Sequence, residues 1–339
     1  MKSLVVELFH HHEVIPRTVD FYQKRGYEVK VVLGSFVYER SKTDAKCIVL
    51  PQPNRKQYTS LNTWKKPIYA LREFIETTKN VRELEKIILR EKPKIVHINT
   101  VETPFAIPLL LMLLRLKTIT FNLTIHSTNR LRVDFKKYMW FDFLIKKSIE
   151  SASQVFLLGP YLKFDAPQIQ EKTVYLIEKR TIKKKSLHGK IVFILTGNLN
   201  RKEKDITLVL QAFSSLIKEH PELKKEVRLE ILTKIDSQTE NEVEELGIQD
   251  ITITHKSFVD QRVFDKSLRT ADYLILSTKQ GSIYGSYKIS GSHTDALAHG
   301  IPIIASKGYA AQYKGEEIVH RFDKDDLVEV LRSVSIKDR

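Results

Sequence analysis

Ser290, Gly291 and Ser292 directly precede a short segment that has helical periodicity. The first turn of a helix carries unpaired backbone N–H groups and the positive end of the helix dipole, and glycine lets an anion approach the backbone closely. The spacing therefore predicts a phosphate-binding turn that would accept a pyrophosphate. A second interpretation is that Ser292 and Asp295 form a capping box, in which Asp295 bonds to the end of its own helix.

A second turn with candidate phosphate ligands follows the apolar run 191–196. It has the sequence GNLNRKEKD over residues 197–205, and Lys202 and Lys204 lie near the start of the next helical segment. Lysine side chains beside a helix N-terminus can neutralise a diphosphate. The turn has neither a Walker pattern nor G-x-G-x-x-G, so the sequence supports neither a P-loop ATPase nor an ordinary dinucleotide site. Taken alone, the turn is better interpreted as a solvated run of charges.

Polar residues in the first half of the chain also follow strand-like segments. His12 and Glu13 follow the first of these segments, Glu102 follows a later one, and His126 ends a third. Ligands of parallel sheets bind beyond the carboxyl ends of the strands, so these residues are candidates for contacts with a substrate. His97 lies inside a strand and is better interpreted as a core residue. Adjacent histidines make a poor metal site, so we expect no metal around His12.

Apolar strands and amphipathic helices alternate through both halves of the chain and must position these residues. We expect strands at 3–9, 28–33, 94–99, 118–126, 155–158, 191–196, 227–232, 251–253, 273–277 and 301–305. We expect helices at 15–25, 81–91, 104–116, 208–219, 239–246 and 261–269, with another short one near 292–299. Strands separated by helices of this size indicate parallel βαβ units. The sequence therefore predicts an α/β protein with two Rossmann-like, doubly wound parallel-sheet domains that face a cleft.

The length of 339 residues is too great for one ordinary domain and fits two. The stretch 178–190 (EKRTIKKKSLHGK) is basic and polar and has no periodicity. We therefore expect an N-terminal Rossmann-like domain over residues 1–180, a basic linker over 181–190 and a C-terminal Rossmann-like domain over 191–339.

The positive charge of the protein belongs to the first half of the chain. Residues 1–190 hold 35 Lys and Arg against 18 Asp and Glu, a net charge of +17, whereas residues 191–339 hold 21 against 23, a net charge of −2. This asymmetry suggests that the first domain faces an anionic membrane surface, a phosphate-bearing substrate or nucleic acid. Lysines that only maintain solubility are the alternative. No recognisable reading motif accompanies the charge, so we expect no nucleic-acid partner.

Cysteine usage and hydropathy bear on where the protein works. The single cysteine, Cys47, excludes an internal disulfide and favours a reducing compartment. The longest apolar run, 105–114, is about half of what a membrane span needs. We therefore expect a cytoplasmic protein. The aromatic and basic segment 132–147 is typical of an interfacial helix that would hold the protein peripherally at the inner face of the membrane, and it is equally typical of an ordinary amphipathic helix.

Five segments of the chain resemble a GT-B glycosyltransferase, nearest to the family-4 group of retaining enzymes that use nucleotide-sugar donors. They are residues 92–100, the strand ending in His126, and residues 194–213, 271–277 and 295–306. The resemblance extends over nearly the whole chain and implies that the second domain binds the donor and the first domain binds the acceptor.

The resemblance implies roles residue by residue. Lys204 matches the basic residue for the donor diphosphate, and His126 matches a histidine that reaches the transferred sugar. Asp295 matches the second acid of a pair, which holds the ribose hydroxyls. Phe258 lies where backbone groups of the family meet the base, and Asn198 stands where the family has an arginine.

The first acid of the family's pair has no counterpart in this chain. Tyr287 stands eight residues before Asp295, and neither Asp nor Glu occurs between Asp272 and Asp295. The resemblance implies that neutral donors in the Gly- and Ser-rich loop 281–292 replace the missing carboxylate.

These residues together predict a glycosyltransferase that builds a surface polysaccharide or glycolipid. It would transfer a sugar, with retention, from a nucleotide diphosphate sugar to a glycan or lipid-linked acceptor. Lys204 and the backbone amides at 290–292 would stabilise the departing phosphate, so we expect neither a metal nor another cofactor. A catalytically silent relative that acts as a binding partner is the alternative, because the family's first acid and one of its cations are missing.

Overall fold

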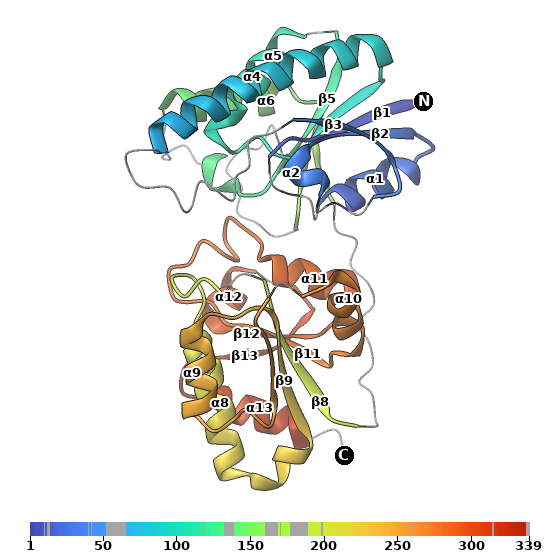
Figure 1. The fold of residues 1–339 in the computed structure, drawn as a ribbon. Helices are drawn as coiled ribbons and strands as arrows, with labels where there is room; N and C mark the ends of the chain where they lie inside the picture. Colours follow the sequence, from blue (N-terminus) through green and yellow to red (C-terminus); the bar gives the residue numbers. More distant parts are fainter. Residues whose placement is uncertain are drawn as a thin grey trace. The chain divides into compact units, whose positions relative to one another are not determined.

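A computed structural model describes most of the chain and divides it into two units (Figure 1). The described residues are 1–9, 11, 14–39, 41, 43–51, 66–116, 118–131, 139–159, 169, 171–176, 189–197, 199–257, 259–313 and 315–336. Described residues up to 176 belong to unit 1, and those from 189 onward belong to unit 2. Of the expected linker, only residues 189 and 190 are described.

Unit 1 contains a seven-stranded sheet in which every strand pair is parallel, in the order β3-β2-β1-β4-β5-β6-β7. The strands are β1 (Lys2–Glu7), β2 (Glu28–Gly34), β3 (Lys46–Leu50), β4 (Ile95–Ile98), β5 (Thr120–Ile125), β6 (Gln154–Leu157) and β7 (Thr173–Tyr175). Leu4 and Val6 of β1 belong to one core cluster, and Val5 belongs to another. This alternation follows from the two-residue period of a strand, and it requires apolar helices on both faces of the sheet.

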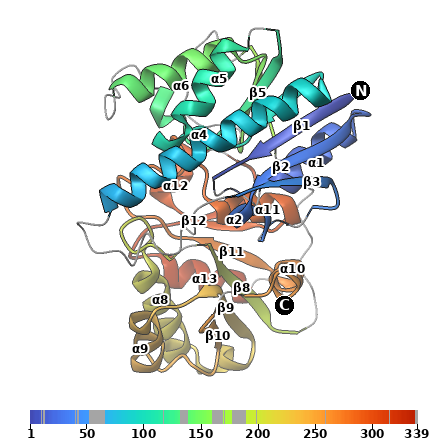
Figure 2. The ribbon, with the colours of Figure 1, turned by 45° about the horizontal axis from the view of Figure 1, so that its top comes forward.

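Helices supply those two layers (Figure 1, Figure 2). They are α1 (Ile15–Gln23), α2 (Ser35–Tyr38), α4 (Lys66–Glu91), α5 (Ile107–Arg115) and α6 (Met139–Ser151), with 3₁₀ turns η3 (Pro104–Ala106) and η4 (Thr128–Leu131). α5 contacts both α4 and α6, and these three helices cover one face of the sheet, whereas α1 lies on the other. α4 begins 15 residues before the predicted helix 81–91, so its first half was missed by the sequence reasoning.

Unit 2 contains a six-stranded sheet in the order β10-β9-β8-β11-β12-β13, again with only parallel pairs among the described strands. The strands are β8 (Ile191–Thr196), β9 (Val227–Lys234), β10 (Thr252–His255), β11 (Tyr273–Leu276), β12 (Ile303–Ser306) and β13 (Ile318–Phe322). The chain winds outward from β8 in one direction to β10, and from β11 in the other direction to β13. The carboxyl ends of β8 and β11 therefore form the topological switch point, where open parallel sheets bind ligands.

The helices of unit 2 are α8 (Ile206–Glu219), α9 (Ser237–Glu245), α10 (Gln261–Thr270), α11 (Gly291–His299), α12 (Lys307–Gln312) and α13 (Leu327–Ile336), with the 3₁₀ turn η5 (Pro221–Lys225). Three of them start at an aspartate, since Asp205, Asp236 and Asp260 each accept a hydrogen bond from a backbone N–H in the first turn. Such caps satisfy donors that the helix itself cannot pair.

The predicted fold, with two doubly wound parallel α/β domains, is confirmed. The strands expected in both halves are present, with ends that differ by a few residues. Within the described residues, no helix combines the length and the apolar character that a bilayer crossing requires.

Candidate functional site

The switch point of unit 2 brings together two residues that lie 88 positions apart in the chain. Lys204 Nζ donates hydrogen bonds to the main-chain O of Thr196, at 2.9 Å, and to Ser292 Oγ, at 3.2 Å. Gly197 turns the chain away from β8 with a φ of 73°. A Cβ at this glycine would lie only 3.1 Å from Ser292 Oγ and 3.4 Å from Lys204 Nζ, so both the left-handed backbone and the close approach favour glycine. The two phosphate candidates of the sequence therefore form one site.

Lys204 is a buried cation, with 8% of its surface exposed. Burial lowers the pKa of its ammonium group to about 8, and the nearby charge of Asp295 opposes this shift. Among the described residues, no carboxylate lies within ion-pair distance of Lys204. An anion that bound here would restore part of the solvation that the ammonium group has lost.

The start of α11 decides between the two interpretations of its sequence. Ser290 is the N-cap and Gly291 is the first helical residue, whereas Ser292 Oγ donates to the main-chain O of Thr196 at 2.7 Å. A capping box would need Ser292 at the N-cap and Asp295 three positions later. Asp295 instead lies in the second turn of the helix, so the capping-box interpretation is wrong. Its half-buried carboxylate acts electrostatically on Lys204.

A buried relay that sequence reasoning missed lies beneath the start of α11. His293 places Nδ1 2.7 Å from the hydroxyl of Tyr309 and Nε2 2.7 Å from a carboxylate oxygen of Glu317. Tyr309 belongs to α12, and Glu317 directly precedes β13. Burial lowers the pKa of His293 against the opposing effect of Glu317, so we assign a neutral ring that accepts from the tyrosine and donates to the carboxylate. The relay links the first turn of α11 to α12 and to the residue before β13.

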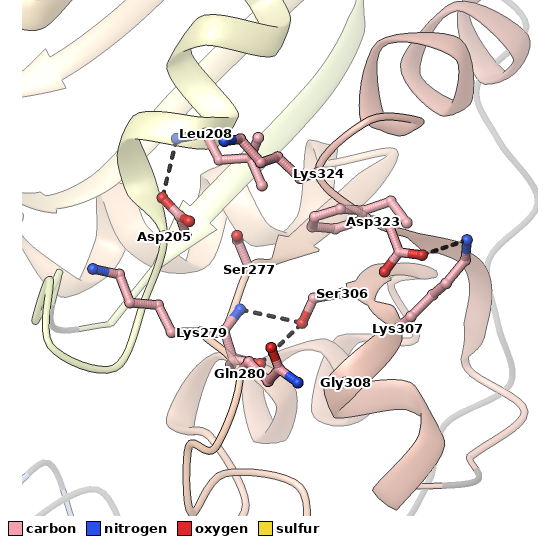
Figure 3. Close-up of a pocket in the computed structure, with 12 residues that line it drawn as sticks. Asp205, Leu208, Ser277, Lys279, Gln280, Ser306, Lys307, Gly308, Asp323 and Lys324 are labelled. Atoms are coloured by element: carbon pink, nitrogen blue, oxygen red, sulfur yellow. Dashed lines mark hydrogen bonds and ion pairs between the residues drawn. The ribbon is translucent and has the colours of Figure 1, made fainter.

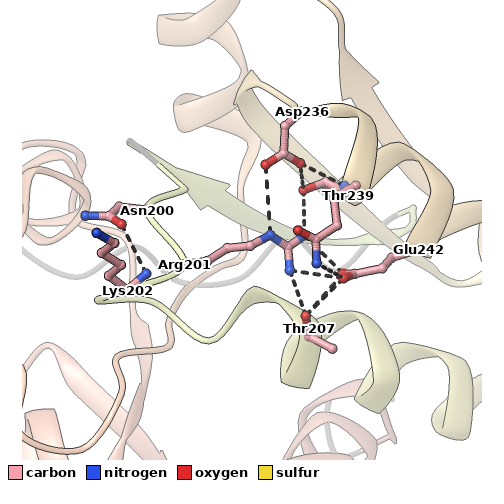
Figure 4. Close-up of polar contacts among 8 residues, drawn as sticks. Asn200, Arg201, Lys202, Thr207, Asp236, Thr239 and Glu242 are labelled. Atoms are coloured by element: carbon pink, nitrogen blue, oxygen red, sulfur yellow. Dashed lines mark hydrogen bonds and ion pairs between the residues drawn. The ribbon is translucent and has the colours of Figure 1, made fainter. Parts of the chain in front are cut away.

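Arg201 lies in the same turn as Lys204 but is held by the protein itself (Figure 4). Its guanidinium donates to both carboxylate oxygens of Glu242, each at 3.1 Å, and to the hydroxyls of Thr207, at 2.7 Å, and Thr239, at 2.9 Å. These contacts attach the turn to α8 and α9. Arg201 is therefore not available to replace the arginine that the family has where this chain has Asn198. Asn198 and Phe258 both lie outside the described residues.

The turn after β5 in unit 1 holds His126, which is 4% exposed. Its Nε2 donates to the main-chain O of Asn99 at 2.8 Å, and its ring stacks on His11 at 3.6 Å between centroids. Glu102 accepts hydrogen bonds from the backbone N–H groups of His126, at 2.7 Å, and Ser127, at 2.9 Å. His126 and Glu102 are thus in contact, as their positions at neighbouring strand ends predict.

The other histidines of unit 1 lie differently from one another. The ring stacked on His126 belongs to His11. His12 and Glu13, the residues that the sequence indicates for contact with a substrate, lie outside the described residues. His97 is fully buried between the hydroxyls of Tyr22, at 3.0 Å, and Thr124, at 2.7 Å. Burial lowers its pKa to about 3, so it is neutral at physiological pH. The interpretation of His97 as a hydrogen-bonded core residue is confirmed.

Comparisons with known proteins agree with the fold. Residues 190–334 match the family model "Glycosyl transferases group 1". The fold resembles the solved structures of a sucrose-phosphate synthase from Thermosynechococcus elongatus (12% identity, 99% of this chain and 90% of that chain, TM-score 0.61) and a UDP-GlcNAc 2-epimerase from Methanocaldococcus jannaschii (12%, 98% and 92%, 0.58). It also resembles an α,α-trehalose-phosphate synthase (UDP-forming) from Burkholderia vietnamiensis (11%, 100% and 93%, 0.59). A search of curated proteins found no match.

Residues 190–334 of unit 2 are therefore similar to the group 1 glycosyl transferases, and the chain has the GT-B fold. The resemblance inferred from the sequence is confirmed, and it classes the protein as a glycosyltransferase. In the part of the chain that the structure describes, no group of three or more His, Cys, Asp or Glu side chains is placed to hold a metal ion.

Proposed function

We propose that the protein transfers a sugar from a nucleoside diphosphate sugar to an acceptor, with retention of the anomeric configuration. The observation that carries this proposal is Lys204, a buried ammonium group at the switch point, in hydrogen-bond contact with the end of β8 and the first turn of α11. A cation without an ion-pair partner in the described structure, beside a helix N-terminus, is suited to a diphosphate.

The chemistry follows from where charge develops. As the bond between the anomeric carbon and the diphosphate breaks, negative charge accumulates on the leaving phosphate, where Lys204 and the N–H groups at Gly291 and Ser292 would stabilise it. The acceptor oxygen forms the new bond on the same face of the sugar and gives its proton to the departing phosphate. The residues of the site thus supply electrostatic stabilisation, and we propose that neither a metal nor another cofactor takes part.

The remaining donor contacts are assigned by resemblance. Asp295 would hold the ribose hydroxyls, Phe258 would lie beside the base, and Ser290 and Asn198 would contribute neutral groups at the phosphates. A uridine nucleotide is the first donor to test, because neighbours in fold include a protein from S. aureus solved with UDP and one from E. coli bound with UDP-2-fluoro glucose. A trehalose-6-phosphate synthase of the same fold has been studied as a case of glycosyl transfer with retention.

We assign the acceptor to unit 1. His126 would approach the transferred sugar, and His12, Glu13 and Glu102 would lie on the acceptor side. Because Glu102 uses its oxygens on the backbone of the turn after β5, its contribution is to shape that turn.

Exposed apolar side chains support a lipid-linked acceptor and a peripheral position at the inner face of an anionic membrane. Trp140 and Phe143 on α6 are 81% and 52% exposed, and Ile68 and Leu71 on α4 are 64% and 61% exposed. Apolar and aromatic side chains beside lysines are typical of surfaces that lie at the lipid interface. This supports a cytoplasmic enzyme of surface polysaccharide or glycolipid biosynthesis.

The test is a binding and turnover panel of nucleoside diphosphates and nucleotide sugars, with the Lys204→Ala variant and Lys202→Ala as a matched control. Lys202 is exposed in the same turn. We expect one nucleoside diphosphate to bind in the micromolar range, and Lys204→Ala alone to weaken it at least tenfold. If no member of the panel binds or is hydrolysed, or if both variants bind like the parent protein, the proposal fails.

A catalytically silent binding protein is the second candidate. It is favoured by Tyr287 in the place of the family's first acid, and by Arg201, which the protein uses for its own structure. Tight binding of a nucleoside diphosphate, with no transfer or hydrolysis of any sugar donor in the panel, would support this function. Any turnover that is lost in Lys204→Ala would exclude it.

A further inference from the structure

A second cavity in unit 2 lies apart from the candidate donor site (Figure 3). It has a volume of about 390 Å³ and lies at the carboxyl ends of β11, β12 and β13, beside the start of α8. Neither Lys204 nor Asp295 nor any residue of the turn 290–292 lines it. The proposed function therefore leaves the cavity without a role.

Two of the lysines that line the cavity have no ion-pair partner among the described residues. Lys279 and Lys324 are exposed at the cavity, and the ammonium group of neither makes a hydrogen bond or ion pair with any residue that the structure describes. The third lysine, Lys307, is already paired with Asp323, at 2.7 Å, and with Asp326, at 2.8 Å. Both side chains are long and flexible, so their ammonium groups can approach a phosphate group that binds in the cavity.

A buried hydroxyl gives an independent sign of a ligand. Ser277 lines the cavity and is 3% exposed, yet its Oγ has no hydrogen-bond partner in the described structure. The neighbouring hydroxyls have partners, because those of Thr278 and Ser306 form a hydrogen bond of 2.9 Å with each other. Buried polar groups are almost always hydrogen-bonded, so an unpaired hydroxyl in a cavity wall indicates a missing partner.

The other walls suit a polyol. Leu208 and Phe322 give apolar surface, on which the carbon skeleton of a polyol can lie. Within the described structure, each of two carboxylates has one bond: Asp205 accepts from the backbone N–H of Leu208 at 3.2 Å, and Asp323 pairs with Lys307 at 2.7 Å. Since a carboxylate accepts more than one hydrogen bond, both can also accept from ligand hydroxyls.

We propose that this cavity is a second ligand site, which binds a small phosphorylated polyol such as a glycerol phosphate or a sugar phosphate. Lys279 and Lys324 bind its phosphate, Ser277 Oγ completes its hydrogen bonds with the ligand, and the two aspartates accept from the hydroxyls.

The site is joined to the donor site through the backbone. Asp205 N donates to the main-chain O of Ser277 at 3.3 Å, and Lys279 N donates to the main-chain O of Glu203 at 2.9 Å. Lys204 lies between these two bonds and forms a bridge with Thr278. A ligand that orders residues 277–279 therefore also orders the segment that carries Lys204. This coupling rests on the proposed function, and by linkage the two ligands change each other's affinity by the same factor.

The experiment is isothermal titration of the full chain with glycerol 3-phosphate, with glycerol and inorganic phosphate as partial probes. We expect glycerol 3-phosphate to bind more tightly than either partial probe, and Lys279→Ala and Lys324→Ala each to weaken it at least fivefold. Ser277→Ala is expected to weaken it about twofold to fivefold. Lys266→Ala, an exposed lysine on α10, is the matched control and should bind like the parent protein.

Three results would overturn the inference. They are the absence of binding at millimolar glycerol 3-phosphate, equal binding of inorganic phosphate, or loss of binding in Lys204→Ala while Lys279→Ala and Lys324→Ala bind normally. The last result would mean that the probe occupies the donor site. Because nucleoside diphosphate binding is measured separately, failure of this site and failure of the proposed function are distinguishable. Circular dichroism of each variant confirms that it is folded.

Discussion

The turn after β8 in unit 2 and the turn after β5 in unit 1 both follow the carboxyl end of a parallel strand. The charged side chain in contact with each turn has different hydrogen-bond partners. Glu102 in unit 1 uses both carboxylate oxygens on backbone N–H groups of the turn. Among the described residues, the ammonium group of Lys204 in unit 2 has only a carbonyl and a hydroxyl as hydrogen-bond partners. The comparison teaches that the half-buried charge of Glu102 maintains a loop, whereas the buried charge of Lys204 is left for an anion to neutralise.

The largest effect is expected from the charge that maintains the loop. Glu102→Ala leaves two backbone N–H groups without their acceptor, at a cost of about 1–3 kcal/mol for each one that stays buried. We expect the free energy of unfolding of unit 1, measured in urea, to fall by about 3 kcal/mol. Glu102→Gln keeps one acceptor oxygen, so its free energy of unfolding should fall by less. Nucleoside diphosphate affinity is expected to stay unchanged, and a parallel loss of both quantities would contradict the comparison.

Lys204→Met should lower turnover and leave the protein more stable, the reverse of what is expected for Glu102→Ala. Removal of a cation that stabilises a leaving phosphate lowers turnover by about 100-fold or more. The same change relieves the desolvation of a buried charge, so we expect the free energy of unfolding to rise by roughly 1 kcal/mol. Steady-state kinetics and urea unfolding of one protein sample give both quantities. A destabilised Lys204→Met variant would show that the lysine is structural.

The pH dependence follows from the pKa of Lys204, which burial lowers to about 8 in the folded protein from its ordinary value of 10.5. Between pH 8 and pH 10.5 the unfolded chain binds more protons at this residue than the folded chain, so the Lys204 contribution to stability rises with pH. Over the same range the ammonium group loses its charge and nucleoside diphosphate affinity falls. Titrations at pH 7, 8, 9 and 10 should show both trends, and Lys204→Met should lack both.

The smallest effect concerns the surface of unit 1. Trp140→Ala removes the most exposed large apolar side chain of α6 and should weaken binding to anionic phospholipid vesicles about threefold to tenfold. Co-sedimentation with neutral vesicles gives the control, and Val263→Ala on the exposed surface of unit 2 gives the matched variant. Equal binding of all three proteins would remove the support for a membrane-facing unit 1.

Much of the fold could be predicted because apolar runs and helical periodicity are local signals. β8, β11 and β12 are short and wholly buried, so their sequences are almost continuously apolar. β3 and β13 lie at or near the sheet edges with mixed burial, and their patterns were too weak to detect. The first half of α4 was missed because its exposed apolar residues, among them Ile68 and Leu71, obscure the amphipathic period.

The candidate site could be predicted only in pieces. Lys204 and Ser292 were each identified as phosphate candidates from the turn chemistry around them, but their contact depends on tertiary structure. The capping-box spacing failed because Ser292 bonds to β8, a partner that no local pattern can reveal. The same holds for the relay through His293, whose partners come from other elements.

The depressed pKa of Lys204 also makes this side chain an unusual nucleophile. At pH 8 about half of its amine is uncharged, whereas an amine with the ordinary lysine pKa of 10.5 is almost wholly protonated. A reagent small enough to enter the site, such as cyanate, should therefore carbamylate Lys204 ahead of Lys202 in the same turn. A bound nucleotide that holds the proton on Lys204 would slow this reaction, so peptide mass spectrometry of the labelled chain would report donor binding without any knowledge of the acceptor.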